Sequence, residues 1–162
     1  MNLEDQCGVL GKIVHLAREE EHTEHGALAV SNVFHREGKK IYCLTDYCMI
    51  SQVGGAEEAH QVIIPAKLSY VFLQNCSKQG NIPVIIHTHG IAYDGALKRD
   101  VSFSPPDMRF IERFAHYAAE IDNIPECLFI VTDGESAQYC RWELGTMEYL
   151  LEEERFGGIE DA

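Results

Sequence analysis

Two histidines at the end of an apolar run are the residues of this sequence whose type and spacing most directly indicate chemistry. The run Ile82–Thr88 is short, apolar and rich in β-branched residues, and it leads into His-Thr-His. These features predict a buried central strand. Because residues two apart in a strand point to the same face, His87 and His89 are expected to project side by side. Such a pair can chelate a metal ion, although hydrogen-bonded structural histidines also occupy such positions.

A catalytic zinc site needs a third protein ligand, because zinc there takes three side chains and leaves one position for water. Asp107 is the candidate, since the segment Ser104–Asp107 reads S-P-P-D, the composition of a helix N-terminus with Ser104 as N-cap. The helix dipole favours a charged carboxylate there. The same segment is also typical of an ordinary helix start. Asp94 and Asp100 remain alternative third ligands, but only Asp107 has a serine three residues before it and a helix to fix its position.

Together these residues resemble the JAMM motif of the JAB/MPN domain metallopeptidases, which is an upstream Glu, then H-[ST]-H-P, seven residues, and S-x-x-D. The corresponding positions here are Glu24, His87-Thr88-His89-Gly90 and Ser104–Asp107, and the resemblance covers most of the chain. The sequence departs from the motif twice. Gly90 stands where the family has proline, and 14 residues rather than eight separate His89 from Ser104.

The resemblance implies a JAB/MPN (cytidine-deaminase-like) architecture and one Zn²⁺ per chain, held by His87, His89 and Asp107. It implies that Glu24 is the general base and that Ser104 hydrogen-bonds near the attacking water or the reaction intermediate. The implied activity is that of a zinc metallopeptidase, an isopeptidase that cleaves after the C-terminal glycine of ubiquitin or a ubiquitin-like protein. The short chain is similar to the stand-alone prokaryotic members. Related MPN domains that lack ligands act as scaffolds or binding modules, but here all five motif positions are filled.

Other readings of the same residues are weaker. Glu24 ends the acidic run 19–24, which by itself is typical of solvated acids, but it also directly precedes an expected strand that could lie beside the His87 strand. His22-Thr23-Glu24 fits the H-x-E half of zinc nucleobase deaminases, but no P-C-x-x-C follows. The helical H-E-x-x-H arrangement is absent, and no cysteine has the context of a nucleophile.

The elements that must position these residues follow from hydrophobic periodicity and turn signals, and they predict an α/β (mixed α+β) fold with a central mixed sheet flanked by helices. The expected helices are Val9–Glu20, a segment between Pro65 and Gly80, one that begins at Ser104, and a last one around Met147, Leu150 and Leu151. The expected strands are Gly26–Phe34, Lys40–Ile50, Ile82–Thr88, Cys127–Val131 and Ser136–Leu144. We assign 1–151 to one domain and 152–162 to an acidic, partly disordered tail. The stretch Gly90–Phe103 is either a flap over the site or an ordinary surface loop.

Composition narrows the function classes. The chain has 162 residues, 46% of them hydrophobic, and a formal charge of −13. This charge argues against nucleic-acid or membrane binding and either favours a basic, lysine-bearing partner or serves solubility alone. Six cysteines without a C-x-x-C pair are expected to be reduced and mostly buried. The acidic start MNLEDQCGVL is unlike a secretory signal, so we expect a cytoplasmic protein, and the sequence leaves a homodimer open.

Overall fold

The computed structural model describes residues 1–20, 23–50, 64–89, 103–121, 124–143 and 146–155, the last of these ranges by its backbone. Along these ranges the elements are β1 (Asn2–Asp5), α1 (Val9–Glu19), β2 (Gly26–Arg36), β3 (Lys39–Met49), α2 (Ala66–Gln79), β4 (Ile82–Thr88), α3 (Pro105–Ala119), β5 (Glu126–Thr132), β6 (Ser136–Glu143) and β7 (Thr146–Arg155). None of the described helices combines the length and the apolar character needed to cross a membrane.

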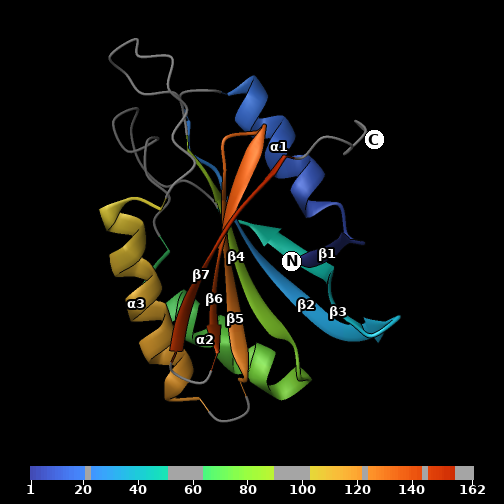
Figure 1. Ribbon diagram of the computed structural model, residues 1–162. Helices are drawn as coiled ribbons and strands as arrows, with labels where there is room; N and C mark the ends of the chain where they lie inside the picture. Colours follow the sequence, from blue (N-terminus) through green and yellow to red (C-terminus); the bar gives the residue numbers. More distant parts are fainter. Residues whose placement is uncertain (21–22, 51–63, 90–102, 122–123, 144–145, 156–162) are drawn as a thin grey trace.

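The strands form one mixed sheet in the order β1-β3-β2-β4-β5-β6-β7. The pairs β1–β3 and β4–β5 are parallel, and the other four pairs are antiparallel. The strand that carries the histidines, β4, is therefore central, with β2 on one side and β5 on the other. Figure 1 shows α1 on one side of the sheet and α2 and α3 on the other. This confirms the expected class, a central mixed sheet flanked by helices.

Each face of the sheet has its own hydrophobic core, because alternate residues of every strand point to opposite faces. On one face α1 buries Val9, Leu10 and Ile13 against a set that includes Val84 and Ile86 of β4. On the other face α2 and α3 pack against a set that includes Ile85 of β4, with the contributing side chains Leu73, Ile111, Phe114, Ala115, Cys127 and Phe129. The face of β4 that carries Ile85 is thus the face toward α3.

Two tight turns join antiparallel strands of the sheet. Glu37 and Gly38 both have positive φ, 52° and 75°, which is the geometry that matches the twist of a two-residue hairpin between β2 and β3. At the β5–β6 turn, Asp133 accepts hydrogen bonds at its Oδ1 from the backbone N–H groups of Glu135 and Ser136, 2.8 and 2.9 Å away. Gly134 takes the positive φ there.

The C-terminal prediction was wrong. The segment around Met147, Leu150 and Leu151 is not a helix but strand β7, which pairs antiparallel with β6. Its Leu, Met and Glu content favours a helix locally, but pairing with β6 overrides that preference. Residues 152–155, assigned to the tail, are part of this strand, and 156–162 lie outside the described residues. The short edge strand β1 was not predicted from the sequence.

The sheet curls around the α1 face far enough to join strands that are not neighbours. In a flat sheet β3 and β5, three positions apart, would be separated by about 14 Å. Instead, Glu126 of β5, only 5% exposed, accepts hydrogen bonds from the Lys40 ammonium and the Tyr42 hydroxyl of β3, both at 2.6 Å. The buried carboxylate is paired, as the cost of burying an isolated charge requires.

The cysteines behave as their spacing indicated. All six are free thiols, and the four at positions 43, 76, 127 and 140 are buried while Cys48 is exposed. Burial raises the pKa of the Cys76 and Cys140 thiols to about 12, which makes both poor nucleophiles at neutral pH.

Candidate metal centre

The two histidines lie at the end of β4 on the face toward α3. His87 follows Ile85 at an interval of two along the strand and is 14% exposed. His89 comes directly after the strand, and its backbone N–H donates to the Thr132 carbonyl at 2.9 Å, so the path of β4 beside β5 continues through this residue. The two imidazoles are neighbours with ring centroids 5.0 Å apart. The expectation that they project side by side is confirmed.

Asp107 reaches the histidines from the first turn of α3. Ser104 is the N-cap and forms a capping box, in which the Asp107 N–H donates to Ser104 Oγ at 3.3 Å and the Ser104 N–H donates to Asp107 Oδ2 at 2.7 Å. Pro105 and Pro106 follow the cap, where a missing N–H has no consequence. Asp107 is therefore both part of an ordinary helix start and the candidate ligand. The capping box fixes the carboxylate that faces the histidines.

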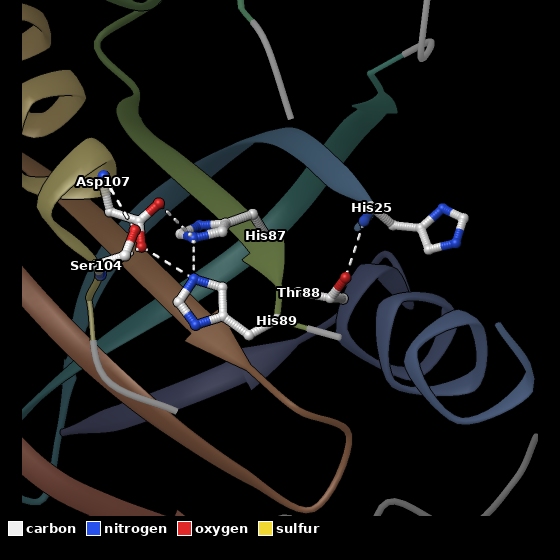
Figure 2. Close-up of polar contacts among 6 residues, drawn as sticks. All are labelled: His25, His87, Thr88, His89, Ser104 and Asp107. Carbon is white, nitrogen blue, oxygen red and sulfur yellow. Dashed lines mark hydrogen bonds and ion pairs between the residues drawn. The ribbon is translucent and has the colours of Figure 1, made fainter. Parts of the chain in front are cut away.

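The three side chains converge on one point, as Figure 2 shows. Asp107 Oδ1 lies 3.0 Å from His87 Nε2, and Asp107 Oδ2 lies 2.9 Å from His89 Nε2. The two Nε2 atoms are 3.2 Å apart. A tetrahedral zinc ion at about 2.0–2.1 Å from each ligand holds its ligand atoms about 3.3 Å apart. The two Nε2 atoms are close to that separation, and each lies within a few tenths of an ångström of it from a different oxygen of Asp107.

The chemistry of the donor set also fits a cation. Without a metal ion, each Nε2 lies within hydrogen-bond distance of one oxygen of Asp107 and can donate to it. When both Nε2 atoms are deprotonated, two lone pairs and a carboxylate face a common centre, an arrangement that a bound divalent ion compensates. Among the described residues, His87, His89 and Asp107 are the group whose geometry could hold a metal ion. Two imidazoles and one carboxylate suit zinc or a related transition metal.

The surroundings keep Asp107 ionised. Its burial disfavours the charge, but hydrogen bonds from the side chains of His87, His89 and Ser104 and the proximity of the His87 imidazole outweigh burial and hold the pKa of the carboxyl well below its usual range. The carboxylate is therefore in the form that binds a metal ion.

Glu24 is placed next to this cluster by the pairing of β2 with β4. Gly26 lies opposite His87 in the antiparallel register, so Glu24, two residues earlier, is opposite His89. Residues opposite each other point to the same face. Glu24 is half-buried, and with His87, Ser104 and Asp107 it lines a cavity of about 260 Å³. The expectation that its strand lies beside the histidine strand is confirmed.

Ser104 lines the same cavity. In the capping box Ser104 Oγ accepts a hydrogen bond from the Asp107 N–H, and the Ser104 side chain also interacts with the Asp107 carboxylate.

The apolar part of the site was not predicted from the sequence. The rest of the cavity wall is hydrophobic and comes mostly from the core between α3 and the sheet, with the lining residues Ile64, Ile85, Phe103, Pro106, Phe110, Ile111 and Phe129. Low polarity around a metal site strengthens electrostatic interactions within it. The alternative ligands Asp94 and Asp100, and residues 90–102 of the expected flap, lie outside the described residues.

Comparison with known protein families and with curated proteins finds no match for this chain. The assignment of a function therefore depends on the site itself.

Proposed function

We propose that this chain is a zinc-dependent isopeptidase of the JAB/MPN type. The observation that carries the proposal is the convergence of His87, His89 and Asp107 on one point. Two of them, His87 and Asp107, line a cavity together with Glu24 and Ser104. The JAMM pattern of the sequence supports the JAB/MPN assignment. The position of the Glu24 strand next to the histidine strand agrees with it.

Each side chain has a role that its position allows. Zinc, when bound to His87, His89 and Asp107, supplies Lewis-acid activation of water and of the scissile carbonyl. Glu24 takes the proton of the attacking water and passes it to the leaving amine. Ser104 donates its hydroxyl hydrogen to the oxyanion, a contact of the kind that is typically worth about 3 kcal/mol. The apolar wall of the cavity limits access of bulk water.

The proposed substrate is a conjugate in which the C-terminal glycine of ubiquitin or a ubiquitin-like protein is joined to an amine. Its support is the resemblance of Glu24, His87-Thr88-His89 and Ser104–Asp107 to the motif of that family. The acidic character of the chain, with 26 acidic and 13 basic residues, agrees with a lysine-bearing substrate. Such a substrate and the absence of a membrane-spanning helix among the described residues agree with the cytoplasmic location that we propose.

The test is hydrolysis by the metal-loaded chain. Metal-free protein is loaded with one equivalent of zinc and incubated with a panel of ubiquitin and ubiquitin-like isopeptide conjugates, and products are identified by mass spectrometry. We expect cleavage after the terminal glycine that a chelator abolishes and added zinc restores. Glu19→Gln, an exposed acid of the same acidic run, is the matched control for Glu24→Gln. Stoichiometric zinc without cleavage of any conjugate would contradict the isopeptidase and favour a binding module.

A further inference from the structure

Thr88, the residue between the two histidines, faces away from them. Its side chain is fully buried, on the α1 face of the sheet. Figure 2 shows its hydroxyl on the opposite side of β4 from the two imidazoles, directed at the backbone of His25. The Thr88 side chain therefore cannot contact a metal ion bound by His87, His89 and Asp107.

What Thr88 does contact is the segment that carries Glu24. The His25 N–H donates to Thr88 Oγ1 at 2.8 Å, and the Thr88 N–H donates to the His25 carbonyl at 2.8 Å. The backbone bond continues the β2–β4 pairing one residue beyond Gly26 and His87, and the bond to Thr88 Oγ1 adds a side-chain contact there. The His25 imidazole lies on the same face, with its Nε2 2.9 Å from a carboxylate oxygen of Glu20 after α1. The backbone of His25 is thus held at both its N–H and its carbonyl by Thr88.

Fixing His25 on the α1 face sets the direction of its neighbour. Successive side chains of an extended chain point to opposite faces, so holding His25 toward α1 turns Glu24 toward α3 and the metal ligands. The cavity agrees, since Glu24 lines it with His87 and Asp107. With only the bond from the Thr88 N–H to the His25 carbonyl, the backbone at His25 could still twist. The second bond, from the His25 N–H to the Thr88 hydroxyl, restricts that twist.

We propose that Thr88 is a positioning residue for Glu24. Its hydroxyl fixes the backbone at His25 and thereby sets where the Glu24 carboxylate stands relative to the three ligands. This inference rests on the proposed function, because the position of Glu24 affects hydrolysis only if Glu24 is the general base. Thr88→Val keeps the shape of the side chain and removes the acceptor of the His25 N–H, and Thr88→Ser keeps the acceptor.

The experiment compares the wild-type full chain with Thr88→Val and Thr88→Ser. Amide hydrogen exchange at His25, zinc affinity by chelator competition, and kcat and KM on an isopeptide conjugate are measured for each. For Thr88→Val we expect exchange at His25 to become about tenfold faster, because one hydrogen bond is lost. We expect kcat to fall by about 10- to 100-fold, as for a small displacement of a catalytic group, with KM and zinc affinity nearly unchanged. Thr88→Ser should keep both the exchange rate at His25 and kcat close to their wild-type values.

Ser31→Ala is the matched control. Ser31 is also buried in the β2–β4 pair, at its other end opposite Ile82, and its hydroxyl bonds to the Asn32 carbonyl. This variant should leave exchange at His25 and kcat unchanged. If Thr88→Val does not fold, Thr88→Ala takes its place.

Three results would overturn the proposal, and they differ from one another. Thr88→Val with normal kcat would refute the positioning role and leave the isopeptidase standing. A loss of zinc affinity in parallel with kcat would show that Thr88 supports the histidines instead. A wild-type protein that cleaves no conjugate would overturn the proposed function, and with it any catalytic consequence of Thr88.

Discussion

Replacing Asp107 with asparagine should remove most of the stabilisation that zinc gives to the fold. The change preserves size and one oxygen that can still accept from the Ser104 N–H, but it replaces the anionic ligand oxygen that faces His87 or His89 with an amide. Loss even of a residue that only orients a ligand lowers metal affinity by about 10–100-fold. Loss of a ligand should lower it by at least about 100-fold.

The expected size of the effect follows from linkage. Zinc at about 100 times the dissociation constant of the wild-type protein stabilises the folded state by about 2.7 kcal/mol. For a chain of this length that is a rise in Tm of about 5–11 °C. If the variant binds about 100-fold more weakly, the same zinc concentration gives about 0.4 kcal/mol, or 1–2 °C.

The assay is thermal unfolding followed by circular dichroism, with and without zinc. Each variant is compared with its own metal-free form, so that any weakening of the capping box cancels. Glu112→Gln removes the same charge from an exposed position of α3 and should keep the full zinc-dependent shift. If Asp107→Asn also keeps the full shift, Asp107 does not bind the metal and the reasoning from its geometry is refuted.

The other predictions concern the base, the thiols and the buried carboxylate. Glu24→Gln should bind zinc as the wild type does and lose at least about 100-fold in kcat, whereas His87→Ala should lose both; zinc titration with kinetics tests this. In the native protein a thiol reagent should modify Cys48 quickly, and only denaturant should release the buried thiols Cys76, Cys127 and Cys140. Tyr42→Phe removes a donor to Glu126 and should lower the free energy of unfolding by about 1–3 kcal/mol in urea titrations. Burial and the bond to Glu126 raise the pKa of Tyr42 in the folded state, so its contribution is complete below about pH 10 and declines as the pH rises further; the variant should lack this decline.

The parts of the fold that the sequence predicted are those with strong local signals. Ile82–Thr88 could be assigned as a buried strand because its β-branched run has few alternatives. The start of α3 was readable because S-P-P-D at Ser104–Asp107 combines a cap, prolines and an acid in the first turn. Gly38 and Gly134 lie in the short turns of the two hairpins, where their positive φ suits glycine.

The parts that escaped prediction depend on distant partners. Strand β1 is four residues long and pairs in parallel with β3, and its sequence, NLED, has no alternation that would indicate a strand. Strand β7 has the composition of a helix and becomes a strand by pairing with β6. Within the site, the residue types and spacing identified His87, His89 and Asp107, but not that the cap of Ser104 would hold the ligand.

The role of Thr88 could not be read from the sequence for the same reason. Alternation along β4 indicates that its side chain faces away from the histidines. It does not indicate that the opposite face holds the backbone of His25, because that contact joins residues 63 positions apart in the chain.

The most direct test of the account is the position of the metal. Crystals of the zinc-loaded protein, measured at the zinc absorption edge, should show one anomalous peak per chain. We predict that it lies about 2.0–2.2 Å from Nε2 of His87, Nε2 of His89 and a carboxylate oxygen of Asp107. No peak in stoichiometrically loaded crystals, or a peak held by other residues, would contradict the account.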